Sequence, residues 1–186
     1  VYPRLNGQHS EYSLSQLNLF RLEKRTNDEG VMMRIRKYRD SDLKDVARLI
    51  SKTFGRFNSG EGSKKSVKNY IDTYTPLKKN LARIKENFDK CSIFYVAVAG
   101  EKIIGIVRGR EDKIVNLFVV GEYHKRGVAR GLVVKFEKTA KGMGGKSIKI
   151  NSSLYAIPFY EKMDYKKVGS ISKLFGLNVQ KMRRGL

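Results

Sequence analysis

The chain has 186 residues, of which 40% are hydrophobic, enough for one domain with a substantial apolar core. No apolar run approaches the length that a helix needs to cross a bilayer, and we expect neither a secretory signal nor a membrane partner. A single cysteine, Cys91, excludes an internal disulfide framework and favours a reducing compartment, so we expect a cytoplasmic protein.

The charge is unevenly distributed along the chain. There are 39 basic and 18 acidic residues, a formal net charge of +21. Residues 1–32 contain four of each kind, so residues 33–186 carry the whole excess, 35 minus 14. This shift predicts an N-terminal extension over 1–32, either a flexible tail or a docking helix formed by SLSQLNLFRLEKR, and a folded domain over 33–186. A domain this basic attracts polyanions.

The first part of the domain reads as one strand followed by helices. Alternation over 33–39 predicts the strand, and an apolar face through Val46, Ala47 and Ile50 predicts a helix over 39–54 that Ser41 would cap. A glycine-rich loop follows. The segments 64–74 and, after Pro76, 77–88 read as two further helices.

The second part is rich in strands. Apolar runs over 92–99, 102–110 and 113–120 predict three strands, which are joined by short turns at 100–101 and 111–112. A helix from Gly127 follows, with Leu132 and Phe136 on its apolar face, and then a strand over 146–153 and a helix around 158–163. The tail supplies one or two more strands. This order predicts an α/β domain with a mixed central sheet of about six to seven strands and helices on both faces.

The junction VNLFVVGEYHKRGVARG, residues 115–131, is the most informative segment of the chain. An apolar strand runs into a short basic turn, and the turn opens a helix. Such a junction directs unpaired backbone N–H groups, the positive end of the helix and cationic side chains at one spot, which is a common way to bind phosphate. Gly127 and Ala129 allow a ligand to approach the backbone closely.

Two segments in this region resemble the GNAT acetyltransferase superfamily. HKRGVA resembles its acyl-CoA-binding signature, and NSSLYAIPFYEKMDY is similar to a later segment that contains Phe-Tyr-Glu-Lys. The two stand in the expected order and separation, and the resemblance spans roughly 33–169. It implies the GNAT fold and an enzyme that transfers an acetyl group from acetyl-CoA to an amine, without a metal.

The resemblance also implies which residues hold the cofactor. The backbone of the basic turn would bind the CoA pyrophosphate, and the end of the preceding strand would pair with the pantetheine arm. The implied cofactor-binding residues are Phe118, Val119, Val120, His124, Lys125, Arg126, Gly127, Val128, Ala129, Arg130 and Asn151. His124 stands where Arg or Gln is usual in the family, and Gly121 stands where proline is frequent.

Tyr160 is the implied catalytic residue, because it matches the family tyrosine whose hydroxyl protonates the leaving thiolate. A phenol with a pKa near 10 exchanges a proton readily with a thiol near 8.5. The alternative is that Tyr160 only packs beneath the sheet. No general base is assigned: Glu111, Asp112 and Glu122 flank the cofactor strand as turn residues, and a water held by Asn116 and Asn151 is a further option.

The acceptor amine is not specified by the sequence. The resemblance places the acceptor side in residues 51–90, which contain many lysines and few acids, a composition that does not favour a polycationic substrate. The acceptor is therefore left as a small molecule or a protein, and the enzyme as a monomer or homodimer. Two other functions remain open: a nucleic-acid-binding module on the same scaffold, and a catalytically silent acyl-CoA sensor.

Overall fold

The computed structural model describes residues 32–186, so the predicted extension over 1–32 lies outside the described residues apart from Met32. The elements run in the order β1 (Met33–Lys37), η1 (Asp40–Asp42), α2 (Leu43–Phe57), α3 (Lys64–Tyr74), α4 (Lys78–Asp89), β2 (Ile93–Ala99), β3 (Lys102–Arg110), β4 (Lys113–Val119), η2 (Gly121–Tyr123), α5 (Val128–Gly142), β5 (Ser147–Ser152), η3 (Leu154–Ala156), α6 (Ile157–Glu161), β6 (Lys166–Lys167), β7 (Ser172–Leu174) and β8 (Leu177–Gly185). No helix in this part of the chain is long and apolar enough to span a bilayer.

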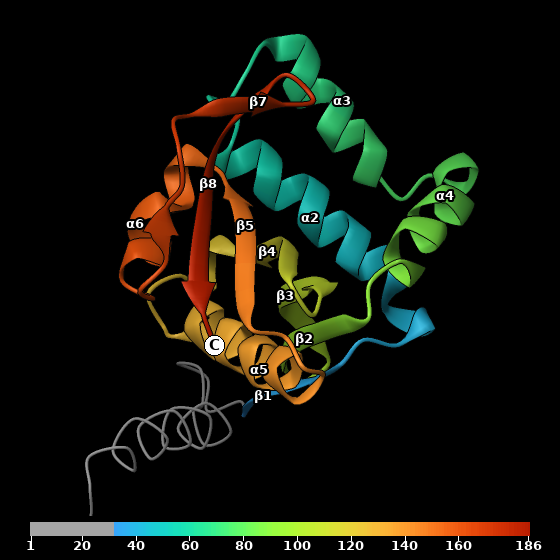
Figure 1. Ribbon diagram of the computed structural model, residues 1–186. Coiled ribbons are helices and arrows are strands. Elements are labelled where there is room, and N and C mark those ends of the chain that lie inside the picture. Colours follow the sequence, from blue (N-terminus) through green and yellow to red (C-terminus); the bar gives the residue numbers. More distant parts are fainter. Residues whose placement is uncertain (1–31) are drawn as a thin grey trace, which may run out of the picture.

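The strands form one mixed sheet, as predicted. Its order is β1-β2-β3-β4-β5-β8-β6, and β7 pairs with β8 as a hairpin. All pairs are antiparallel except β4 with β5, which is parallel. The sheet has eight strands because the tail supplies three strands, where one or two were predicted. Figure 1 shows β5 and β8 side by side, with the β7–β8 hairpin reaching α3.

Helices cover both faces of the sheet, also as predicted. On one face, Leu132, Val133 and Phe136 of α5 pack with Tyr160 of α6 in the larger apolar cluster. On the other face, α2 and α4 pack against β2 and β3 in a second cluster, which contains Ile50. Along β2, alternate residues therefore enter different clusters, which follows from the two-residue period of a strand.

The start of α2 differs from the prediction that Ser41 caps the helix. Ser41 lies inside the short turn η1, and α2 begins at Leu43 after Asp42. The buried Asp42 carboxylate accepts hydrogen bonds from the Arg39 N–H at 2.8 Å and from both terminal nitrogens of Arg36 at 2.6 and 2.8 Å. A buried carboxylate needs such partners, and the guanidinium of the adjacent strand provides them.

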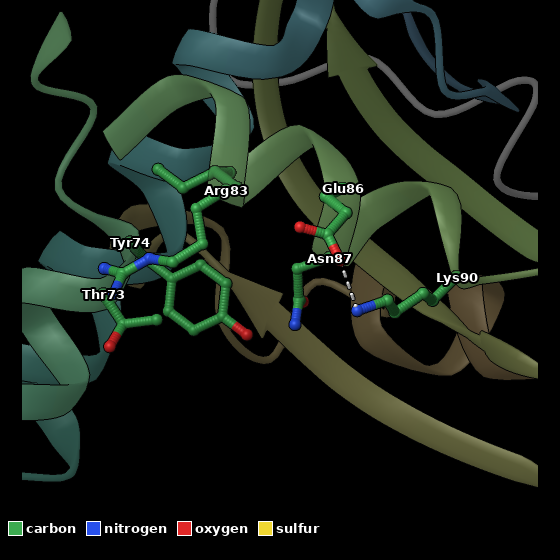
Figure 2. Close-up of a pocket in the computed structure, with 7 residues that line it drawn as sticks. Thr73, Tyr74, Arg83, Glu86, Asn87 and Lys90 are labelled. Atoms are coloured by element: carbon green, nitrogen blue, oxygen red, sulfur yellow. Dashed lines mark hydrogen bonds and ion pairs between the residues drawn. The ribbon is translucent and has the colours of Figure 1, made fainter. Parts of the chain in front are cut away.

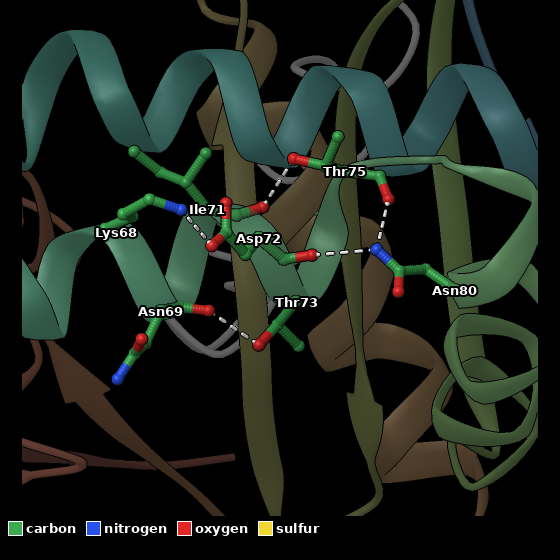
Figure 3. Close-up of polar contacts among 7 residues, drawn as sticks. All are labelled: Lys68, Asn69, Ile71, Asp72, Thr73, Thr75 and Asn80. Carbon is green, nitrogen blue, oxygen red and sulfur yellow. Dashed lines mark hydrogen bonds and ion pairs between the residues drawn. The ribbon is translucent and has the colours of Figure 1, made fainter.

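The connection between α3 and α4 is held by one side chain. Asn80 Nδ2 donates to the carbonyl oxygens of Asp72 at 3.1 Å and Thr75 at 3.0 Å, as Figure 3 shows. These carbonyls lie at the end of α3, where the last helical acceptors lack partners within the helix. The bonds fix the direction in which α4 leaves α3.

The pairing of β4 with β5 is short. It comprises Lys113 with Lys149 and Ile114 with Ile150, while β4 continues to Val119 and β5 to Ser152. Beyond Ile114 and Ile150 the two strands are no longer paired, so the sheet is split at its centre. The basic turn that opens α5 follows the free end of β4.

Candidate active site

The turn between β4 and α5 has the backbone geometry of an anion-binding site. Lys125 and Gly127 have φ values of 59° and 82°, and such left-handed residues in a turn direct successive N–H groups to one side. The first helical bond is donated by the Gly131 N–H to the Gly127 carbonyl at 2.9 Å. The N–H groups of residues 128–130 therefore have no partner within the helix. A glycine is required at 127, because a side chain at this φ is strained.

The charge around this turn is positive. Lys125 and Arg130 are exposed there, and Arg126 lies over the Tyr123 ring at 5.7 Å. The first turn of α5 contains no acidic residue. Cations and free N–H groups at the start of a helix match the chemistry of a diphosphate, so these residues fit the predicted CoA site.

The backbone of β4 presents polar groups to the split. The Val120 N–H donates to the Ile104 carbonyl of β3 at 2.9 Å, and backbone groups alternate in direction along an antiparallel strand. The groups of Phe118 and Val120 are thus directed at β3, and those of Leu117 and Val119 at the split. Leu117 was not named from the sequence; reading the alternation along this strand would have found it.

His124 is engaged by the protein through both ring nitrogens. Nε2 lies 2.8 Å from the Val119 carbonyl, to which it donates, and Nδ1 lies 3.5 Å from the Tyr155 hydroxyl. The Phe57 ring packs against the imidazole at 4.7 Å between centroids. The structure therefore places His124 as a link between β4 and η3, beside the phosphate turn.

Tyr160 lies in the larger apolar cluster, on the face of the sheet that α5 covers. The residue is 2% exposed, and its ring contacts Phe159 and Tyr165 at 5.0 and 5.4 Å between centroids. No hydrogen bond joins its hydroxyl to another described residue. Within residues 32–186, the side-chain polar atom that is fully buried and lacks a hydrogen bond is Tyr38 Oη. Tyr160 Oη also lacks a hydrogen bond, so it is not fully buried and retains a small contact with solvent. Burial, followed by the nearby Glu137, raises the pKa of Tyr160, which keeps the phenol protonated.

A buried guanidinium, that of Arg108, lies behind β4 on the face of the sheet that α2 and α4 cover. Arg108 of β3 is 1% exposed, and its five N–H donors reach Asn116 Oδ1, Asn87 O and Oδ1, Cys91 Sγ and Tyr74 Oη at 2.7 to 3.4 Å. Every one of these acceptors is neutral. Figure 2 shows Tyr74 and Asn87 at the adjacent pocket between α3 and α4. This network was not predicted from the sequence, since an arginine in a strand ordinarily faces water.

The network fixes the amide of Asn116. Its Oδ1 accepts from Arg108 Nε at 2.7 Å, and its Nδ2 donates to Tyr70 Oη at 3.0 Å. Both ends of the amide are thereby oriented, on the face of β4 that packs against α2 and α3. Asn151, its proposed companion, lies on β5 next to the last β4–β5 pair and is half-buried.

The predicted carboxylates lie in turns and have other partners. Glu111 accepts from Ser92 Oγ at 3.3 Å and Asp112 lies 3.8 Å from Lys149, both at the far end of β4, about 20 Å from its free end at ~3.3 Å per residue. Exposed Glu122 pairs with Arg56 at 3.2 Å, and its own N–H and Arg56 lower its pKa. A carboxylate with a lowered pKa is a weaker base.

Glu61 is a buried acid that the sequence placed only in a glycine-rich loop. Its carboxylate accepts from the N–H groups of Leu154 at 3.1 Å and Tyr155 at 3.0 Å, and its carbonyl accepts from the Asn178 N–H at 2.6 Å. It therefore joins the loop after α2 to η3 and to β8. Through Tyr155 and His124, this joint connects with the end of β4.

The fold and the site define an α/β protein with a phosphate-type turn at a split in its sheet. A family model for the GNAT acetyltransferase domain matches residues 59–186. The chain therefore belongs to the GNAT acetyltransferase family, which confirms the resemblance drawn from its two motifs. A sequence comparison with curated proteins gives no significant match.

Solved structures share the fold at low sequence identity. A GCN5-related N-acetyltransferase from Rhodopseudomonas palustris has a TM-score of 0.70 at 18% identity, covering 82% of this chain and 94% of the other. The PaiA N-acetyltransferase from Thermoplasma acidophilum, in complex with coenzyme A, has 0.63 at 19%, covering 83% and 99%. An aminoglycoside 6′-N-acetyltransferase complexed with coenzyme A has 0.58 at 16%, covering 81% and 96%.

Proposed function

We propose that this protein is an acetyl-CoA-dependent N-acetyltransferase, in which a primary amine attacks the acetyl group directly within a ternary complex. The observation that carries the proposal is the split between β4 and β5 beside the turn at 124–127. Membership of the GNAT family and the coenzyme A complexes of two structural neighbours support it.

The chain supplies binding groups along a continuous path. The N–H groups of residues 128–130, with Lys125 and Arg130, would hold the CoA diphosphate. The backbone groups of Leu117 and the N–H of Val119 would pair with the amides of the pantetheine arm, as a neighbouring strand does. Acetyl-CoA supplies the acetyl group as a thioester, and the backbone amides at the split polarise the carbonyl oxygen.

Tyr160 supplies the proton for the departing thiolate. In the transfer a nitrogen–carbon bond forms and the carbon–sulfur bond breaks, so the amine loses a proton and the sulfur gains one. The fixed ring of Tyr160 and its unbonded hydroxyl suit this role. Its raised pKa keeps the phenol protonated but also makes it a weaker acid, so the proton moves only as negative charge develops on the sulfur. The amine proton leaves to solvent, since the carboxylates flanking β4 have other partners.

Turnover with acetyl-CoA and a panel of amines tests the proposal, with free thiol as the readout. We expect thiol release that depends on an amine and on Tyr160. Tight acetyl-CoA binding without thiol release for any amine would identify a silent acyl-CoA sensor instead. Salt-sensitive RNA binding without acetyl-CoA binding would identify a nucleic-acid-binding module.

A further inference from the structure

The tip of the β7–β8 hairpin combines backbone strain with an exposed aromatic side chain. Leu174 pairs with Leu177, and the two residues between them, Phe175 and Gly176, have φ values of 53° and 78°. Positive φ at both central residues is the requirement of a type I′ turn, which favours Asn, Asp or Gly. A phenylalanine in this conformation is uncommon, because its side chain crowds the backbone.

Packing within the chain does not account for this phenylalanine. Its side chain is 87% exposed, the largest value among the exposed apolar residues of 32–186. The apex itself is firmly anchored: Gly62 forms a bridge with Leu177, and a Cβ at Gly176 would lie 2.3 Å from Ser66 Oγ. A fixed backbone therefore holds the ring out into solvent. No packing within the described residues compensates the unfavourable φ, which indicates that the ring contacts another molecule.

The surroundings of Phe175 are apolar and then basic. Leu174, next to it in the chain, and Ile171, just before β7, are also exposed. Lys173 lies on β7, and Lys64 and Lys65 open the helix against which the apex packs; these three lysines form no ion pair within residues 32–186. Residues 165–186 contain six basic residues and no acidic one. We call Ile171, Leu174, Phe175 and these lysines the hairpin-tip surface.

The hairpin-tip surface connects with the proposed acceptor side of the site. The loop at its base contains Glu61, whose carboxylate holds Tyr155, and Tyr155 contacts His124 beside the end of β4. The tip also packs on Gly62 and Ser66, which lie in residues 51–90, the segment expected to shape the acceptor side, so a molecule seated on the tip would contact that segment. With acetyl-CoA assigned to the split, the acceptor is the reactant that remains to be placed.

We propose that the acceptor amine is carried by an acidic polypeptide, which docks an apolar side chain against Phe175 and its carboxylates against Lys64, Lys65 and Lys173. This inference rests on the proposed function and adds the substrate class. Aliphatic neighbours and an aromatic anchor with a basic rim match the composition of a protein interface. Stacking of nucleic-acid bases would instead use several aromatic faces, and this tip has one.

The test compares three amines: a peptide with a free amino terminus followed by Glu and Leu residues, the same peptide with Arg in place of Glu, and alaninamide. We expect a KM about tenfold lower for the acidic peptide than for the Arg peptide. Phe175→Asn should raise the KM of the acidic peptide about tenfold and leave alaninamide kinetics unchanged. Asn tolerates this φ, so the turn is kept. Met143→Asn, which removes an apolar side chain that is 49% exposed at the far end of α5, should change neither.

A binding measurement separates this inference from the proposed function. Fluorescence anisotropy of the acidic peptide, acetylated so that it cannot react, should show Kd rising about tenfold in Phe175→Asn and in the Lys64→Gln, Lys65→Gln double variant. If no amine releases thiol, the proposed function fails, while weaker binding in these variants still supports the docking surface. Unchanged binding, or an equal loss with alaninamide, overturns the inference. The inference is also overturned if the Phe175→Asn and lysine variants bind the acidic peptide normally and instead lose binding to anionic vesicles, to single-stranded RNA or to a second copy of the chain.

Discussion

Arg108 and Asn116 face each other across β3 and β4 and are joined by a hydrogen bond of 2.7 Å from Nε to Oδ1. The pair couples a buried cation to the strand that borders the split. The guanidinium also lies over the Phe88 ring at 4.7 Å, so aromatic packing complements its five polar contacts. The strand bearing the proposed pantetheine-binding backbone is thereby fixed from behind.

Arg108→Ala should lower the free energy of unfolding by about 3 kcal/mol or more, because it leaves buried Asn116 and its other partners without a donor. Urea denaturation measures this change. The control is Arg110→Ala on the same strand, which is exposed and should cost within about 0.5 kcal/mol. Equal effects of the two substitutions would show that the buried hydrogen bonds of Arg108 do not contribute measurably to the free energy of unfolding.

Gly127→Val should raise the Kd for acetyl-CoA by about tenfold or more, since a branched side chain resists the φ of 82° and fills the approach to the turn. Isothermal titration calorimetry gives the constant. Gly142→Ala serves as the control, because a Cβ there meets no other atom within 4 Å. Unchanged acetyl-CoA binding in the valine variant would remove the turn from the site.

Tyr160→Phe should lower kcat about a hundredfold and leave the Kd for acetyl-CoA unchanged, because the ring packing survives and the proton donor is lost. Since the pKa of Tyr160 is raised, the wild-type rate should not fall through loss of this proton below about pH 10. Stopped-flow thiol detection across pH measures both. Tyr165→Phe is the control: it loses the 2.8 Å bond to Glu137, at about 1.5 kcal/mol of stability, and should keep kcat.

Asp42→Asn should destabilise the fold by about 2 kcal/mol at neutral pH, because it removes the charged partner of Arg36. The Arg36 hydrogen bonds, ahead of other causes, lower the pKa of Asp42 below its ordinary 3.8. Its stabilisation is therefore present above 3.8 and is lost as pH falls through the lower folded value. Urea denaturation at neutral pH and at about pH 2 should show the difference shrinking in acid. Asp45→Asn, in an exposed pair with Arg48, should cost less than about 0.5 kcal/mol.

Phe175→Gly should raise the free energy of unfolding by about 1 kcal/mol, because glycine adopts the left-handed conformation without crowding. Thermal unfolding detects this gain. A loss of stability would mean that the ring packs against the fold, and the conformation of Phe175 would no longer indicate an external partner at the hairpin tip.

The sequence predicted elements well wherever apolar residues follow a clear period. The strands β2, β3 and β4 and the helices α3, α4 and α5 stand within a few residues of their predicted positions. Ser41 was wrongly expected as a cap because Asp42, one residue later, has a stronger partner in Arg36, and that partner is visible only after folding. The tail has one strand more than predicted. The additional strand, β6, has two residues and no recognisable period.

The candidate site was predictable only where local chemistry defines it. The turn around Gly127 combines glycine and cations within a few residues, and it stands in the structure with the geometry expected of such a turn. Glu61 and Arg108 depend on partners far away in the chain, respectively Tyr155 and Tyr74 among others. Such long-range pairs follow from the packing of α2, α3 and η3 against the sheet, which no local pattern specifies.

The shortness of the β4–β5 pairing gives α5 a mechanical role. Strands β1 to β4 and strands β5, β8 and β6 form two half-sheets that share few backbone bonds. Helix α5 contacts β2, β3 and β4 on one side, and its Glu137 reaches Arg184 of β8 at 3.1 Å on the other. One helix thus bridges both halves, and the carboxylate that links it to β8 lies more than two turns from the phosphate-binding end.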